Sequence, residues 1–323
     1  MSSLVRSIIV AVAALLSGST VFAQDAFPSK TIRFVVPFPP GGPPDLMARL
    51  VTPKLTELWG KPVIVENRGG ATGTIGSAAV VKAAPDGHMI LLTPNQPISL
   101  APALFQTPYD PIKDLIPIAA LGESTNALVV SANSSYNTVG ELIAAAKAKP
   151  GALTFSSSGQ GSIGHLTGEM IKQIAGIDML HIPYPAAGPS VTAVVTGEVT
   201  VSGSSIQQSL PLLKSGRLRA LGVTGPRPSK YLPELKPLAE LGLPGLGITV
   251  WYAAYAPART PRQTLLALRE ALLAAFQEPG VQQKLDGVGI EWLAQEPEQI
   301  TARIDQELAQ WRKLVQTARI TVQ

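Results

Sequence analysis

The chain has 323 residues, a formal net charge of +4 and no cysteine. Hydrophobic residues make up 46% of it and charged residues 15%, which is typical of a globular protein and excludes a disordered chain. Because the lysines and arginines are scattered, with no basic run interleaved with aromatic residues, the positive charge does not indicate a nucleic-acid partner.

Residues 1–23 are typical of a secretory signal peptide. Arg6 precedes an apolar run from Ile8 to Leu16, and small and polar residues follow that run. The alternative is a membrane anchor, but the run is shorter than the ~20 residues that span a bilayer. We expect cleavage near Ala23 and a mature periplasmic protein that starts at Gln24. Its 300 residues (323 less 23) are enough for about two domains.

The first part of the mature chain alternates between strand and helix patterns. Strands are expected at Thr31–Val36, Val63–Glu66 and Met89–Thr93, and helices at Asp45–Trp59 and Ile75–Ala84. Such alternation indicates βαβ units and a parallel sheet. After Pro108-Tyr109-Asp110-Pro111 we expect an apolar connection that leads to a second series.

The second series repeats the alternation. Strands are expected at Ala127–Ser131, Leu153–Ser156, Met179–Ile182, Val199–Ser202 and Leu218–Val223. Helices are expected at Val139–Lys149, Ile163–Ala175, Pro189–Thr196 and Ile206–Ser215. In the first of these helices Leu142, Ala145 and Ala146 have the spacing of a buried face, and Gly151 follows as a stop signal.

The last part of the chain follows the Pro/Gly-rich stretch 243–247. A strand through Trp251 and Tyr255 leads to two long helices, Pro261–Gln277 and Pro297–Thr317, each with proline near its first turn. We expect this region to pack back on the first part. The predicted lobe 1 then comprises residues 24–124 plus 246–323, and lobe 2 comprises residues 125–245. We expect Trp251 and Tyr252 to be buried near the hinge, with the chain crossing near residues 124 and 246.

Two loops have the composition of a ligand-binding wall. The stretch 36–42, Val-Pro-Phe-Pro-Pro-Gly-Gly, lies between a strand and a helix pattern, and so does the stretch 156–165. Glycines let a bound group approach the main chain, and the first amides of a helix have no partner within it. Such a place suits an anion. We interpret the two loops as walls of one cleft.

Several motifs along the chain match those of a known family. The motifs, in order, are Phe27–Lys30, Val36–Gly42, Trp59–Arg68, Ala83–Gly87, Pro108–Pro111, Ser157–Ser162, His181–Tyr184, Leu218–Thr224 and Leu243–Gly245. With these matches over essentially the whole mature chain, the sequence resembles the Bug family of periplasmic solute-binding proteins.

The resemblance implies a fold and a role. The implied fold is α/β, a two-lobed periplasmic binding protein of the Venus flytrap, type II-like kind, in which each lobe is a mixed sheet flanked by helices. The implied role is to close on a small carboxylate and deliver it to the membrane subunits of a tripartite tricarboxylate transporter. The resemblance implies no catalysis and no cofactor, and we expect a monomer that closes by a hinge motion.

The resemblance also places the ligand site. The expected contacts are Phe38, Pro40, Gly41, Gly42, Asp45, Thr93 and Asn95 in the first lobe, and Ser157, Ser158, Gly159, Gly161, Ser162, His165, Tyr184, Gly188, Pro189 and Ser204 in the second. Main-chain amides and serine hydroxyls would donate to the carboxylate, in charge-assisted bonds.

Three of these residues have an alternative interpretation. Asp45 and Ser162 each precede or begin a helix pattern and could serve as its N-cap. A carboxylate at position 45 would also repel one end of a dicarboxylate ligand. Phe38 lies between prolines and could pack within its own loop rather than over a ligand.

Two departures from the family pattern bear on the ligand. Where relatives often have Tyr-Lys-Gly, this chain has Tyr184-Pro185-Ala186, which removes a cation and an amide donor. Where relatives often have aspartates, it has Thr200 and Ser204. We therefore expect a carboxylate whose distal end is uncharged or aromatic.

Two other classes compete with a transport receptor. An enzyme has weak support: Gly159–Gly164 matches G-x-G-x-x-G, but the next strand lacks the expected acid. No Gly-x-Ser-x-Gly elbow occurs, and His88, His165 and His181 lack metal-ligand spacing. The runner-up is a ligand sensor that acts on a sensor kinase, since sensing and transport use the same ligand-selected closed state. We expect no enzyme and no metal.

Overall fold

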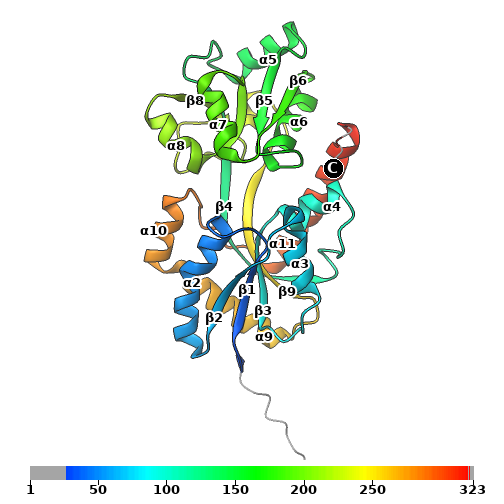
Figure 1. Cartoon of the computed structure of the whole chain (residues 1–323), viewed down its shortest axis with the longest axis vertical. Helices are drawn as coiled ribbons and strands as arrows, with labels where there is room; N and C mark the ends of the chain where they lie inside the picture. The colour runs from blue at the N-terminus through cyan, green and yellow to red at the C-terminus, as the bar shows by residue number, and fades with distance from the viewer. Residues whose placement is uncertain (1–26, 319, 321–323) are drawn as a thin grey trace, which may run out of the picture.

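The structure is a computed structural model that describes residues 27–318 and residue 320, so the expected signal peptide lies outside the described residues. Figure 1 shows two lobes joined by two long strands. The fold is α/β, with a mixed sheet flanked by helices in each lobe, as the sequence predicts. Within the described ranges, none of the helices has the length and apolar character needed to cross a membrane.

The first lobe is built on a mixed sheet with the strand order β2-β1-β3-β9-β4. The parallel strands are β1 (Ile32–Val36), β2 (Val63–Asn67) and β3 (Met89–Pro94). Strand β9 (Thr249–Pro257) pairs antiparallel with β3 and with β4 (Leu115–Ser131). The helical elements of the first lobe are α2 (Pro43–Trp59), η1 (Ala71–Gly73), α3 (Thr74–Val81), η2 (Gln96–Leu100), α4 (Ala101–Leu104), α9 (Arg262–Gln277), α10 (Pro279–Gly287) and α11 (Pro297–Thr317).

The second lobe is built on a smaller mixed sheet. Strand β7 (Val201–Ser205) pairs antiparallel with β4 and parallel with β5 (Leu153–Ser157), which pairs parallel with β6 (Met179–Pro183). Strand β8 (Leu218–Val223) covers the other edge of β4. The helical elements of the second lobe are α5 (Val139–Ala148), α6 (Ile163–Ala175), α7 (Ala187–Thr196), α8 (Ile206–Lys214) and η3 (Leu238–Leu241).

Strand β4 belongs to both lobes. Residues 115–125 pair with β9 in the first lobe, and residues 126–131 pair with β7 and β8 in the second. The sequence led us to expect a strand only from Ala127 and an apolar connection before it, which is wrong. Residues 115–122 are nearly all buried, so both faces of the strand are covered and no polar alternation marks it.

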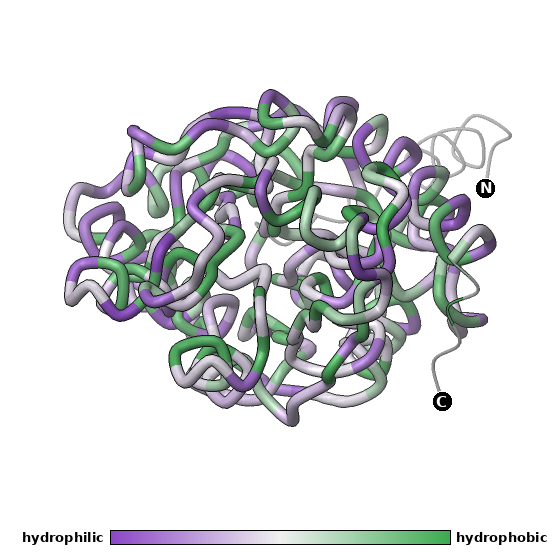
Figure 2. The backbone as a smooth tube through the Cα atoms, turned by 90° about the horizontal axis from the view of Figure 1, so that it is seen from above, coloured by the Kyte–Doolittle hydropathy of each residue, from purple (hydrophilic) through white to green (hydrophobic). Residues whose placement is uncertain are grey.

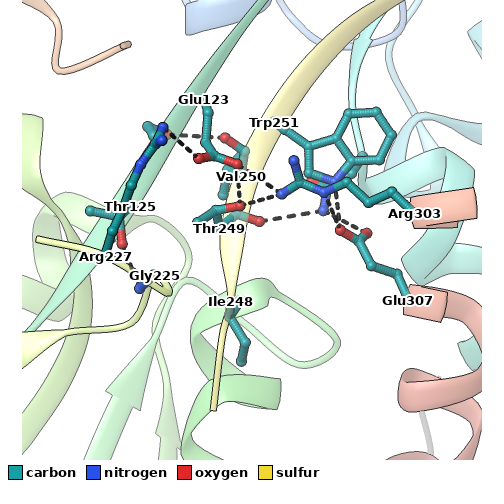
Figure 3. A network of polar contacts seen from close by, with 12 residues as sticks. Glu123, Thr125, Gly225, Arg227, Ile248, Thr249, Val250, Trp251, Arg303 and Glu307 are labelled. Atoms are coloured by element: carbon teal, nitrogen blue, oxygen red, sulfur yellow. Dashed lines mark hydrogen bonds and ion pairs between the residues drawn. The ribbon is translucent and has the colours of Figure 1, made fainter. Parts of the chain in front are cut away.

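A network of charged and polar side chains joins α11 to both crossing strands (Figure 3). Arg303 of α11 donates to Glu123 of β4 at 2.8 Å and to Glu307 at 3.1 Å. Glu307 also accepts from the indole nitrogen of Trp251 in β9, at 2.6 Å. Arg227 of the second lobe lies 3.6 Å from the other oxygen of Glu123. The C-terminal helix therefore holds the two crossings together.

Apolar packing also links the lobes. Leu166 of α6 belongs to the same buried cluster as Leu100 of the first lobe and Trp311 and Leu314 of α11. Trp251 is fully buried and Tyr252 is 4% exposed, which confirms the expectation that both are core residues of the crossing strand. Figure 2 shows short hydrophobic and hydrophilic stretches alternating along the chain, as expected for amphipathic elements packed around sheets.

Candidate functional site

The parallel strands of each lobe end on the side that faces the other lobe. Strand β9 starts at Thr249, opposite Thr125 at the crossing, and runs away from the second lobe. Because β3 is antiparallel to β9, β3 and its parallel partners β1 and β2 run toward the second lobe. By the same reasoning β5, β6 and β7 run toward the first lobe. Ligands of open α/β sheets bind outside such carboxyl ends.

The loop after β1 offers few donors. Helix α2 begins at Pro43, two residues earlier than expected, with Gly42 as its N-cap. Pro43 and Pro44 fill its first two positions, and proline has no backbone N–H. The helix start therefore lacks two of the amides that a bound anion would need. Asp45 is the third helical residue, so the interpretation of Asp45 as the N-cap is wrong.

The Asp45 carboxylate holds the same loop together. It accepts from the Gly41 amide at 2.9 Å and from Arg49 at 3.0 and 3.1 Å, and the residue is 3% exposed. Burial acts to raise the pKa of Asp45, but these hydrogen bonds outweigh it and place the pKa below its usual value. Asp45 thus fixes the shape of the loop and is already neutralised by Arg49.

Phe38 packs within the first lobe. A Cβ placed on Gly73 would lie 3.1 Å from Phe38 Cζ and 3.2 Å from Pro97. The Phe38 ring therefore packs against Gly73. Its carbonyl accepts from Asn67 Nδ2 at 3.1 Å. Pro40 and Gly41 are exposed, so their surfaces remain open to a ligand.

Thr93 and Asn95, the two candidates after β3, are buried. Thr93 has no exposed surface and Asn95 is 1% exposed. Asn95 Nδ2 donates to Glu307 at 3.1 Å, while its Oδ1 has no partner among the described residues. Both side chains therefore lie inside the first lobe, and Asn95 is connected to the network around α11 through Glu307.

A further loop faces the same side and was not among the sequence-based candidates. It follows β2 and contains four consecutive residues with positive φ, Gly70, Ala71, Thr72 and Gly73. Left-handed conformations at alanine and threonine cost free energy and persist at functional sites. The run Gly69-Gly70 was the available signal. We add Ala71 and Thr72 as candidate site residues.

The loop after β5 is held by its own side chains. Ser157 Oγ accepts from the Gly159 amide at 3.2 Å, and the Gly161 amide donates to His165 Nδ1 at 3.1 Å. Ser162 is the N-cap of α6, because its hydroxyl accepts from the His165 amide. Of the five loop candidates, Ser158 is exposed and its hydroxyl is free to turn toward a ligand.

Two helices start beside this loop with unused amides. The cap of α6 leaves the first two helical amides, those of Ile163 and Gly164, without a hydrogen-bond partner among the described residues. Helix α7 starts at Ala187, and the side chain of its N-cap, Ala186, provides no bond. Strands β5 and β6 are neighbours, since the amide of Tyr184 donates to the Ser157 carbonyl at 2.9 Å.

The remaining candidates of the second lobe lie around these helix starts. Gly188 and Pro189 are exposed residues in the first turn of α7. The Tyr184 hydroxyl donates to Glu198 at 2.8 Å. Ser204 is 4% exposed on β7, so its hydroxyl is largely within the lobe. The structure therefore brings the candidates together as two sets, one at the strand ends of each lobe.

One serine–histidine pair invites comparison with a hydrolase. Ser157 Oγ lies 2.7 Å from His181 Nε2, but Ser157 is only 2% exposed and its hydroxyl is also bonded to Gly159. Burial, then the neighbouring His165 and Lys172, lower the pKa of His181 to about 4, which makes it a weak base at neutral pH. The geometry therefore favours a structural role for this pair.

Comparisons with known proteins agree with this description. Residues 47–320 match the family described as "Tripartite tricarboxylate transporter family receptor". A UPF0065 protein from the tcbD–tcbE intergenic region of a Pseudomonas species is 35% identical over 315 residues, 96% of this chain and 93% of the relative. Protein BugT of Bordetella pertussis is 32% identical over 295 residues, 91% of this chain and 90% of BugT.

Two solved structures are similar over the same extent. A Rhodopseudomonas palustris protein with adipate has a TM-score of 0.77 and 29% identity, covering 91% of this chain and 99% of that one. MatC of the same species, with bound malate, has a TM-score of 0.74 and 28% identity, covering 90% of this chain and 100% of MatC. By its match over residues 47–320 and its motifs, this chain belongs to the TctC/Bug family of tripartite tricarboxylate transporter receptors.

Proposed function

We propose that this receptor captures a small carboxylate between the strand-end loops of its two lobes and delivers it to the membrane subunits of a tripartite tricarboxylate-type transporter. The observation that carries the proposal is the pair of helix starts at α6 and α7, on adjacent strands β5 and β6. Amides at helix starts point at an anion and the helix dipole favours its charge. The exposed Ser158 hydroxyl adds a further donor.

The two lobes differ in what they offer such a ligand. The second lobe presents the amides of Ile163, Gly164 and Ala187, whereas prolines 43 and 44 remove donors from the first. Asp45 is paired with Arg49 and does not act as a free anion. We infer that the second lobe holds the carboxylate group and the first lobe closes over a distal end that is uncharged or aromatic.

The solved relatives support carboxylates as the ligand class. One of them holds adipate and another holds malate, and both ligands are dicarboxylates. Our ligand proposal for this chain differs, because it predicts that a second negative charge on the ligand does not increase the binding affinity. A panel of mono-, di- and aromatic carboxylates therefore tests both the class and the finer preference.

The experiment uses the mature chain from Gln24, unfolded and refolded to remove any bound ligand. A ligand that binds only the folded state raises the melting temperature by mass action. We expect a dose-dependent rise for a monocarboxylate or aromatic carboxylate, with Kd confirmed by calorimetry. No rise across the panel contradicts carboxylate capture. Tighter binding of malate than of any monocarboxylate contradicts only the uncharged distal end.

The proposal extends to location and motion. We propose export to the periplasm with cleavage near Ala23, which the mass of the protein recovered from the periplasmic fraction tests. We propose residues 24–124 plus 246–323 as one moving body and residues 125–245 as the other, with hinges near residues 124 and 246. Small-angle scattering with and without the ligand tests the closure, which should reduce the radius of gyration.

A further inference from the structure

Three aromatic rings are stacked beneath the loop after β5. The His165 and His181 ring centroids lie 4.0 Å apart with planes inclined by 13°, and Phe155 lies 4.8 Å beyond His181. His165 comes from the first turn of α6 and His181 from β6, so the stack connects the two elements whose ends form the proposed carboxylate site. His165 is 8% exposed.

His165 holds one glycine of the loop. Its Nδ1 accepts the Gly161 amide at 3.1 Å, which requires an unprotonated Nδ1 and places the proton of the neutral ring on Nε2. Gly161 has φ of +71°, a conformation that glycine adopts readily. A doubly protonated His165 could not accept this amide, and the two N–H groups would repel each other.

His181 holds the other glycine indirectly. Its Nε2 lies 2.7 Å from Ser157 Oγ. The same hydroxyl is bonded to both the amide and the carbonyl of Gly159, at 3.2 and 2.9 Å, where φ is +112°. Each imidazole therefore fixes one left-handed glycine of the loop.

The surroundings disfavour protonation of both rings. Burial lowers the pKa of His165, with Glu169 acting to raise it and Lys172 to lower it. Glu169 Oε1 is 4.0 Å from His165 Nε2, but it also pairs with Lys172 at 3.0 Å. Lys172 in turn lies 3.9 Å from Asp178 and 5.9 Å from the Phe155 ring centre. Two stacked rings 4.0 Å apart cannot both be charged without mutual repulsion.

We propose that His165 and His181 are positioning residues that set the shape of the loop 157–162, and that protonation of His165 releases the Gly161 amide and weakens capture of the anion. The proposal rests on the proposed function, since it assigns the loop to carboxylate binding. It predicts the opposite of direct contact, because an imidazolium that touched the ligand would bind an anion more tightly as the pH falls.

The first test is an NMR titration of the ligand-free protein. The chain has three histidines, so each ring signal can be assigned with single variants. We expect His165 and His181 to titrate below the ordinary value near 6.5 and the Gly161 amide shift to follow His165. His88 in the first lobe is the control, since His88→Gln should leave the Gly161 shift unchanged. A Gly161 amide that does not respond to His165 overturns the proposal.

The second test separates the hydrogen bond from the ring. His165→Asn keeps an acceptor near the Nδ1 position without a titrating group, and His165→Phe keeps a ring without an acceptor. At pH 7, with adipate, malate and the aromatic monocarboxylate benzoate as probes, we expect near wild-type affinity for the first variant and roughly tenfold weaker binding for the second. Equal affinity of both folded variants overturns the positioning role. If no carboxylate of the panel binds the wild type, the ligand class fails and the Gly161 titration still decides the role of His165.

Discussion

Arg303 Nη2 lies 2.8 Å from Glu123 Oε2, which joins the C-terminal helix to the strand that crosses between the lobes. The same carboxylate oxygen accepts from Thr249 Oγ1 at 2.9 Å, at the start of the second crossing strand. The Arg303 guanidinium lies 5.0 Å from the Trp251 ring centre. A single carboxylate on β4 therefore contacts both the C-terminal helix and the second crossing strand.

Replacing Glu123 with Gln removes the charge that faces Arg303 and Arg227. The Glu123 and Arg303 side chains are 13% and 21% exposed, so the remaining Arg303 charge is only partly solvated. Removing one partner of a largely buried pair is destabilising. We expect the free energy of unfolding to fall by about 1–3 kcal/mol, measured by urea unfolding.

Glu57→Gln is the matched control for this variant. Glu57 pairs with Lys54 at 3.5 Å, but its side chain is 75% exposed. Exposed pairs contribute little, so the unfolding midpoint should not change. Equal loss in the two variants would show that the network around Arg303 does not stabilise the protein.

Gly168 lets α6 lie close to the ring stack. A Cβ at this position would lie 2.2 Å from Phe155 Cε2, and Phe155 is 2% exposed and stacked on His181. Overpacking a fixed core costs about 1–3 kcal/mol, so Gly168→Ala should lower the free energy of unfolding by that amount. An added Cβ at Gly280 in α10 would have no neighbouring atom within 4 Å outside its own stretch of helix, so Gly280→Ala should instead stabilise the protein slightly. A wild-type midpoint for Gly168→Ala would contradict the close packing.

The elements that could be predicted from the sequence are those with a clear period and clear end signals. Helix α6 is predicted and observed at Ile163–Ala175, and β8 at Leu218–Val223. Helix α10 was missed, because Glu278-Pro279-Gly280 has the composition of a turn and only Val281 and Leu285 are buried. In these cases tertiary packing decided what local composition left open.

The site was predictable at the level of loops and less so at the level of contacts. The glycines and serines of 157–162 marked the loop, and its position at a strand end is observed. That His165 takes the Gly161 amide depends on how α6 packs, which no spacing reveals. Likewise, Ala71 and Thr72 carry no signal for their left-handed conformation, which the surrounding loop imposes.

The pH dependence of Asp45 follows from its partners. Its folded-state pKa is lowered, so the stabilisation is complete above the ordinary value and is lost as the pH falls through the lowered value. Asp45→Asn should cost about 1–2 kcal/mol at pH 7, because the Gly41 amide and Arg49 lose a charged acceptor. Urea unfolding at several pH values should show the difference from wild type shrink below pH ~4. A difference that stays constant to lower pH would contradict the charge-based account.

The amide of Ala187 can be removed without disturbing the helix that it starts. Ala187 is the first residue of α7, where proline is tolerated, and Ala186 has the extended conformation (φ −157°, ψ 166°) that proline requires before it. If this amide donates to the carboxylate, Ala187→Pro loses one charge-assisted hydrogen bond. We expect affinity for the carboxylate with the largest thermal shift to fall about tenfold, or ~1.4 kcal/mol by calorimetry.

Arg262→Pro provides the control, because it places proline at the first residue of α9, outside the strand-end loops. Arg262 is exposed, and the N-cap residue before it, Pro261, has an extended backbone (φ −58°, ψ 140°). The substitution should therefore leave both the fold and the affinity unchanged. Equal affinity of Ala187→Pro and wild type would show that the Ala187 amide does not donate to the ligand. Capture would then depend on the amides of Ile163 and Gly164 at the start of α6, the Gly188 amide and the Ser158 hydroxyl.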